Sequence, residues 1–169
     1  MNDHRSHIVV GVVPGQPAAV LTAAALFARH FGADLVCAFI DANRYVAEEL
    51  PDGTVTSLSI NPDLPDLLHE TFAPELRAQL AAALEGQDVL WSTRALAGGP
   101  AQALARLANK LDAKLIVVGT REPGFRGTMH EFMNGSVAAQ LAHRQHRPVV
   151  VIPLNPVADD GDLPWNAAS

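Results

Sequence analysis

The sequence has one cysteine, few charged residues and no long hydrophobic run. Cys37 has no second cysteine with which to form an internal disulfide, which favours a reducing, cytoplasmic environment. No apolar run approaches the roughly 20 residues that a membrane-spanning helix needs. Residues 1–7 also lack the apolar core of a signal peptide. With a formal net charge of -6, broad nucleic-acid binding is unfavourable. We therefore expect a cytoplasmic protein without a membrane or nucleic-acid partner.

Several motifs of nucleotide-binding and hydrolytic enzymes are missing as well. There is no G-x4-G-K-(S/T) run, which marks a P-loop, and no G-x-G-x-x-G after the first expected strand. A G-x-S-x-G nucleophile motif is also absent, so catalysis has no support in the sequence. A metal site needs three or four converging ligands, and the clustered candidates are only His130, Glu131, His143 and His146. We expect no metal centre there, and we expect Cys37 to be a small core residue.

What the sequence does contain is an alternation of short apolar runs with stretches of helical periodicity. Hydrophobic residues make up 49% of the 169 residues, which is enough for one buried core. The expected strands are 8–13, 35–40, 89–94, 115–118 and 149–152, and the expected helices span about 17–31, 66–84, 100–111 and 136–147. This order predicts an α/β fold with a five-stranded parallel sheet and helices on both faces. We expect one domain, residues 8–154, between an N-terminal tail (1–7) and a C-terminal tail (155–169).

Residues 43–62 are the least regular part of the expected domain. Pro51, Asp52-Gly53 and Asn61-Pro62 are turn signals. They predict a long loop, which in a compact domain is commonly functional.

The segment between the fourth and fifth expected strands is rich in glycine. Glycine lets backbone N–H groups approach a phosphate closely, and the start of a following helix adds further donors. The candidates for such a cradle are Gly119, Gly124, Gly127, Gly135 and Ser136. The same residues are also typical of a strand end, loop turns and a helix cap. Four arginines lie in or beside this segment, where an anion could use them: Arg121, Arg126, Arg144 and Arg147.

The last expected strand, Val149 to Ile152, is apolar and β-branched. As an exposed sheet edge it would recruit another strand, and pairing with the same strand of a second copy follows two-fold symmetry. The alternative is that the C-terminal tail covers this edge. We favour a homodimer with Val149, Val150, Val151 and Ile152 at its interface.

Taken together, these motifs resemble the universal stress protein family over nearly the whole chain, from about Ile8 to Pro153. The resemblance depends on the turn at 10–15, the end of the second strand at 39–41, Gly99-Pro100 and, most specifically, the closing run from 115 to 153. It implies a Rossmann-like sheet of the adenine nucleotide alpha hydrolase type and a homodimer paired through its last strand. In one branch of the family, ATP binds at the loops after strands one and four.

That branch carries G-x2-G-x9-G-(S/T) after the fourth strand, and this chain departs from the pattern. Gly119, Gly135 and Ser136 match it, but Glu122 stands where the second glycine belongs, and the loop is three residues longer. ATP-binding members also usually carry an aspartate at the end of strand one, where this chain has Val13. A valine cannot accept a hydrogen bond from a ribose.

The resemblance nevertheless implies a set of nucleotide-binding residues: Gly11, Val12, Val13, Phe39, Gly119, Arg121, Gly124, Gly127, Gly135, Ser136 and Val137. We expect a dimeric stress-response regulatory module that binds ATP or another adenine nucleotide, with Mg²⁺, and that is not an enzyme. The alternative is a nucleotide-free dimeric scaffold that acts through protein–protein contacts. Slow nucleotide hydrolysis is a third possibility, but no pair of residues is placed to carry it.

Overall fold

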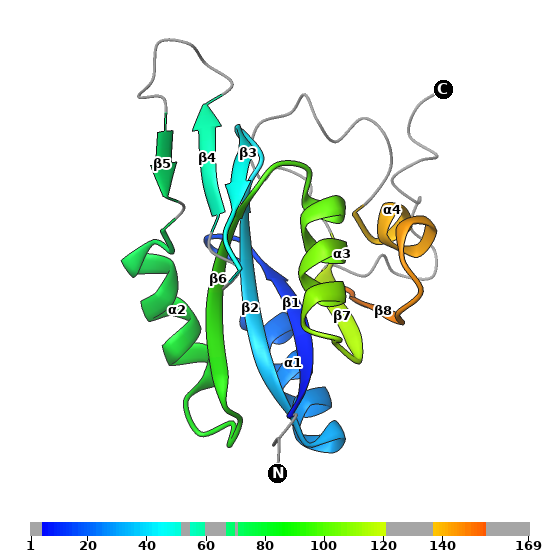
Figure 1. Cartoon of the computed structure of the whole chain (residues 1–169). Helices are drawn as coiled ribbons and strands as arrows, with labels where there is room; N and C mark the ends of the chain where they lie inside the picture. Colours follow the sequence, from blue (N-terminus) through cyan, green and yellow to red (C-terminus); the bar gives the residue numbers. More distant parts are fainter. Residues whose placement is uncertain (1–4, 52–54, 60–66, 70, 121–136, 155–169) are drawn as a thin grey trace, which may run out of the picture.

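The computed structural model of the chain describes residues 5–51, 55–59, 67–69, 71–120 and 137–154. Its centre is a parallel sheet of five strands in the order β6-β2-β1-β7-β8 (Figure 1). The strands are β1 (Ser6–Val12), β2 (Ala33–Asp41), β6 (Trp91–Ala97), β7 (Leu115–Gly119) and β8 (Val149–Ile152). The predicted five-stranded parallel sheet is therefore confirmed.

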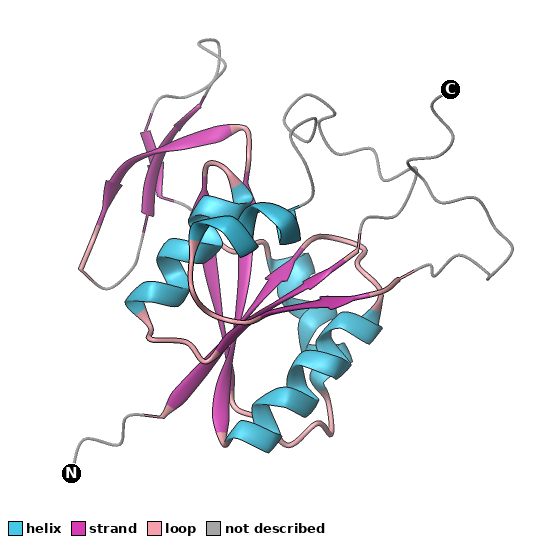
Figure 2. Cartoon of the chain, turned by 90° about the vertical axis from the view of Figure 1, so that its right-hand side faces the viewer, coloured by secondary structure: helices cyan, strands magenta, loops and turns pink. Residues whose placement is uncertain are grey.

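Helices cover both faces of this sheet, as predicted (Figure 2). α1 (Ala18–Phe31) and α2 (Pro74–Leu84) pack on one face, and α3 (Pro100–Lys110) and α4 (Val137–Arg144) pack on the other. Among the described residues, no helix is both long and apolar enough to cross a membrane.

The core consists of two apolar clusters, one on each side of the sheet. Successive residues of a strand point to opposite faces, so Val10 lies in the cluster under α1 and α2, and Val9 lies in the cluster under α3. Both faces being buried explains why the strands are continuous apolar runs. Cys37 is fully buried in this core, and burial raises the pKa of its thiol to about 12. It is the small core residue that its position in mid-strand predicts.

The prediction of a long loop over residues 43–62 is wrong. This part of the chain contains β3 (Arg44–Glu49) and β4 (Val55–Ser59), which form an antiparallel sheet with β5 (Leu67–His69). The helix predicted from about Asp66 also begins later, at Pro74, because residues 67–69 belong to this second sheet. Proline is favoured in the first turn of a helix, which agrees with the observed start of α2.

The small sheet packs beside α3, over the carboxyl end of β6 (Figure 1). Val46 of β3 and Val55 of β4 join the apolar cluster on the α3 face together with Leu96 of β6. At the end of β3, the ammonium of Lys110 on α3 lies 3.2 Å from the carboxylate of Glu49 and donates to the Leu50 carbonyl. The small sheet thus covers the carboxyl end of β6 on this face, whereas helices cover the other strands.

Candidate ligand crevice

The order of the strands places the switch point of the sheet between the carboxyl ends of β1 and β7, and the region outside these two strand ends is the candidate crevice. From β1 the chain passes to β2 on one side, and it later returns to β7 on the other side. The helices that follow these two strands, α1 and α4, lie on opposite faces of the sheet. In open sheets of this kind, ligands bind outside the carboxyl ends of the strands at such a switch point. Val13, after β1, and Gly119, at the end of β7, lie at this edge.

The turn from β1 to α1 is closed by two glutamine side chains. The Val13 N–H donates to the side-chain oxygen of Gln16 at 3.2 Å, and the Gln16 N–H donates back to the Val13 carbonyl at 3.2 Å. Gly15 has a φ of 72°, a left-handed conformation that glycine adopts without strain. Its N–H donates to the side-chain oxygen of Gln79 on α2 at 3.3 Å. Two N–H groups that border the crevice are thus already bonded within the protein.

Gly119, at the end of β7, packs closely against this turn and the start of α1. A Cβ at Gly119 would lie 3.0 Å from a methyl of Val20, 3.2 Å from Leu154 and 3.3 Å from the side-chain nitrogen of Gln16. These contacts are tighter than ordinary packing, so a larger residue at this position would have to displace the ends of the neighbouring side chains. Gln16 therefore spans the ends of β1 and β7, because it bonds to Val13 on one side and lies against Gly119 on the other.

The predicted residues of the first two strands take different environments. Val12 is buried in the core, so its side chain cannot meet a ligand, whereas Val13 is 44% exposed. Gly11 packs against Leu104 of α3. Phe39 of β2 lies opposite Val12 of β1. Its ring makes an edge-to-face contact with Phe72, with ring centroids 6.4 Å apart. Val13 and the partly buried Phe39 are thus the apolar side chains available on the β1–β2 side of the crevice.

The remaining predicted nucleotide-binding residues belong to the β7–α4 connection. Val137 begins α4 and packs in the cluster under α3. Arg121, Gly124, Gly127, Gly135 and Ser136 lie outside the described residues, as do Glu122, Arg126, His130 and Glu131. In the described part of the chain, no three His, Cys, Asp or Glu residues are grouped to hold a metal ion.

The prediction that an anion beside the glycine-rich segment could use Arg147 is wrong. Its Nε donates to the Ala113 carbonyl at 2.7 Å, and its terminal nitrogen lies 3.1 Å from the carboxylate of Asp112. Both partners precede β7, so Arg147 lies at the amino end of that strand, opposite the crevice. It joins the start of β8 to the α3–β7 turn.

Sequence reasoning missed three residues that shape this edge of the sheet: Gln16, Gln79 and Phe72. Gln79 is 64 residues from Gly15 in the chain, so no local pattern could indicate their contact. Phe72 precedes a helix and carries no motif. Gln16 follows the Pro14-Gly15 turn, but glutamine is not among the residues that favour turns, so its contacts carried no signal either.

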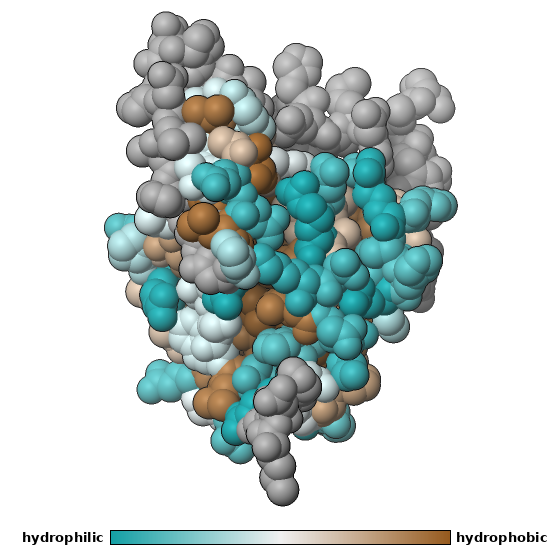
Figure 3. Space-filling model, viewed as in Figure 1, coloured by the Kyte–Doolittle hydropathy of each residue, from teal (hydrophilic) through white to brown (hydrophobic). Residues whose placement is uncertain are grey.

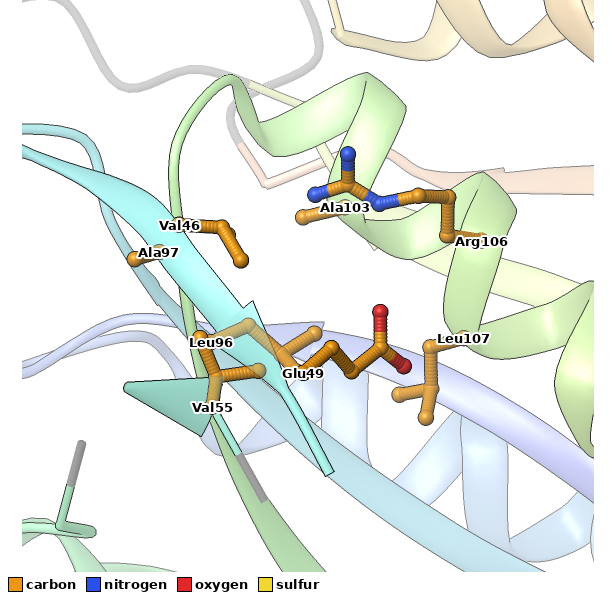
Figure 4. A pocket seen from close by; sticks show the side chains of 8 residues that line it. All are labelled: Val46, Glu49, Val55, Leu96, Ala97, Ala103, Arg106 and Leu107. Atoms are coloured by element: carbon orange, nitrogen blue, oxygen red, sulfur yellow. The ribbon is translucent and has the colours of Figure 1, made fainter. Parts of the chain in front are cut away.

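A small hollow lies between the small sheet and α3, away from the candidate crevice (Figure 4). Figure 4 shows that the polar side chains of Glu49 and Arg106 lie among apolar lining residues, which include Val55 and Leu96. About 10 Å³ of it admits a water-sized sphere, which is room for roughly one water molecule. This hollow is a packing seam and is too small for a nucleotide.

A doubly wound parallel sheet with a crevice at its switch point defines a Rossmann-like α/β protein. More specifically, the model of the universal stress protein family matches residues 4–153, and the chain belongs to this family. The resemblance found in the sequence is therefore confirmed. No curated protein sequence matches the chain.

Solved structures of universal stress proteins share the fold. One in complex with cAMP is 20% identical, with a TM-score of 0.58, and the match covers 89% of this chain and 98% of that one. One from Archaeoglobus fulgidus in complex with dAMP is 21% identical, with a TM-score of 0.55 and coverage of 87% and 97%. One from Arabidopsis thaliana with AMP bound is 13% identical, with a TM-score of 0.53 and coverage of 92% and 97%. At these identities the similarity shows the fold alone.

Proposed function

We propose that the protein is a non-catalytic universal stress protein that binds an adenine nucleotide in the crevice between β1 and β7. The observation that carries the proposal is the position of this crevice at the switch point of the sheet. The structurally similar proteins with cAMP, dAMP and AMP support the choice of ligand, since all three ligands contain adenine, a pentose and one phosphate.

The proposed binding mode divides the ligand between the two sides of the crevice. Val13 and Phe39 line the adenosine side, where the backbone at Phe39 supplies polar contacts. Gly119, Gly124, Gly127, Gly135, Ser136 and Val137 hold the phosphates through backbone N–H groups, with Arg121 beside them. Mg²⁺ accompanies a di- or triphosphate. No residue takes a catalytic role, and the protein acts as a dimeric stress-response regulator in the cytoplasm.

A nucleotide-free scaffold is the second candidate, and the closed β1–α1 turn favours it. Val13 presents an apolar side chain to solvent, and the N–H groups of Val13 and Gly15 are already bonded to glutamine oxygens. A protein that never binds nucleotide has no need to keep these donors free. In this case the dimer faces and the small antiparallel sheet would make the functional contacts.

Calorimetric titration separates the two candidates. The protein is titrated with AMP, cAMP, dAMP, ADP and ATP, with and without Mg²⁺. We expect binding heat with at least one adenine nucleotide and none with the corresponding guanine nucleotide. If no adenine nucleotide gives heat at millimolar concentration, nucleotide binding is rejected and the nucleotide-free scaffold remains.

A single substitution then locates the site. Gly135→Val adds a branched side chain where the proposed phosphate contacts need bare backbone, so we expect nucleotide binding to be lost. The same variant should elute like the wild type in size-exclusion chromatography, which controls for folding and assembly. Unchanged affinity would place the nucleotide elsewhere.

A further inference from the structure

We propose that two arginine side chains cap the free edge of β6 and prevent the β8 strand of another copy from pairing there. The inference concerns how copies of the chain assemble, and it does not depend on nucleotide binding. β6 is the outermost strand of the main sheet, and no described strand pairs with the side of β6 that faces away from β2 (Figure 1). Such an unpaired edge recruits other strands unless something blocks it.

The backbone of β6 presents Thr93 to this free edge. In a parallel pair, the N–H and C=O of one residue point to the same side of the strand, and the side alternates from one residue to the next. The Leu90 carbonyl and the Gly98 N–H both bond to β2, and the register between them is regular. The even-numbered residues of β6 therefore face β2. The backbone groups of the odd-numbered residues, Thr93 among them, point away from the sheet.

Two arginines reach Thr93 from opposite faces of the sheet. Trp91 packs against the cluster under α1 and α2, so the side chain of Thr93, two residues on, lies on the same face. From α2, Arg77 lies over the Trp91 ring, 5.9 Å from its centroid, and donates to the Thr93 hydroxyl at 3.2 Å. Arg94 starts from the opposite face, where Leu96 is buried under α3, and its guanidinium donates to the Thr93 carbonyl at 2.9 Å. This bond turns the Arg94 side chain around the edge and occupies an acceptor that an incoming strand would need.

The cap lies on the part of β6 that the small sheet leaves uncovered. Leu96 and Ala97, at the carboxyl end of β6, are buried where the small sheet packs, whereas residues 91–95 are partly exposed. Without the Arg94 charge, the aliphatic β8 of another copy could pair with this exposed part. Pairing of β8 with β6 is head-to-tail and leaves one free edge of each kind, so it does not close and generates open assemblies. The arginine cap thus protects the protein from open-ended growth.

Arg94→Thr tests the cap, because threonine suits a strand but carries no charge. By size-exclusion chromatography with light scattering, we expect species larger than the wild type that grow with protein concentration. They should appear at a concentration roughly tenfold below any at which the wild type assembles, since a hydrogen bond to a charged group is commonly worth at least that factor. Arg94→Lys keeps a charge at the edge and should stay at the wild-type size. Lys114→Thr removes a charge from an exposed residue before β7 and is the matched control, which should also keep the wild-type size.

A double variant, Arg94→Thr with Val151→Lys, identifies the strand that pairs with β6. The added charge on β8 opposes strand pairing, so the larger species should disappear. Arg94→Thr at the wild-type size would overturn the proposal. Larger species in Arg94→Lys as well would also overturn it, because they would result from general destabilisation, and near-UV circular dichroism checks the fold of each variant. Larger species that persist in the double variant would overturn β8 as the strand that the cap excludes. The proposed nucleotide site is tested separately by the calorimetric titration.

Discussion

At the scale of single residues, Gly119 sets how closely the β1–α1 turn can approach the end of β7. Gly119→Ala places a methyl group 3.0 Å from Val20 and 3.2 Å from Leu154, so one of them must move. We expect a loss of about 1–3 kcal/mol in the free energy of unfolding, as for other overpacked sites. Denaturant titration measures it. Gly99→Ala is the matched control, because none of the described atoms lies within 4 Å of the added Cβ, and a stability equal to that of the control would contradict this account.

Cys37 gives a second prediction at this scale, on reactivity and pH. Burial in the apolar core penalises the thiolate and raises the pKa of Cys37 from 9.0 to about 12. At pH 8 the folded thiol is protonated and enclosed, so a thiol reagent should label it only as fast as the protein opens. Because the folded pKa is the higher one, its contribution to stability is complete below about pH 9 and is lost as the pH rises toward 12. Rapid labelling of the native protein at pH 8, at the rate seen in denaturant, would contradict the assignment.

At the scale of elements, two substitutions can show whether apolar packing or an ion pair attaches the small sheet to the rest of the protein. Val55 is 3% exposed between Leu96 and Leu107, so Val55→Ala should cost about 2 kcal/mol in lost burial and cavity formation. The ion pair of Glu49 and Lys110 is more than a third exposed, and Lys110→Ala should cost under about 1 kcal/mol. Denaturant titration and hydrogen exchange of β3 and β4 compare the two variants. A larger loss in Lys110→Ala would mean that charge holds the sheet.

The same elements show what sequence patterns can and cannot predict. β1 and β7 lie close to their predicted bounds, because a strand buried on both faces is a continuous apolar run. β4 escapes prediction because Thr56 and Ser57 are buried polar residues, which interrupt that pattern. Ser57 is satisfied by Arg44, whose Nε donates to its hydroxyl at 2.6 Å, and such a partner cannot be identified from sequence. At the crevice, the positions of Val13 and Gly119 can be predicted because they lie where apolar strands end. The contact between Gln79 and Gly15 cannot be predicted in this way, because it depends on the tertiary fold.

At the scale of the whole molecule, the two edges of the main sheet differ in chemistry. β6 carries the polar residues Ser92, Thr93 and Arg94, and a charge such as that of Arg94 opposes pairing with another strand. β8 is entirely aliphatic, and in the described part of the chain it pairs only with β7. Away from β8, the exposed large hydrophobic residues that the structure describes are Leu26 and Phe31 on α1 together with Val13, Tyr45 and Leu90 in three other parts of the chain, and the face in Figure 3 is mostly hydrophilic over α3. We therefore propose β8 as the surface that would pair with a second copy.

The position for testing this dimer follows from how β8 packs. Val150 and Ile152 contact the core under α1, so a charge there would disturb the fold itself, whereas Val151 is 43% exposed. In a two-fold pairing of β8 with its copy, Val151→Lys brings two like charges into one interface, and we expect a monomer by size-exclusion chromatography with light scattering. Val151→Thr keeps the β-branched shape without charge and should leave the dimer intact. Circular dichroism confirms that both variants are folded. A folded Val151→Lys dimer would show that the copies associate through another surface, because no edge-to-edge pairing of β8 could accept the two ammonium groups without a large loss of affinity.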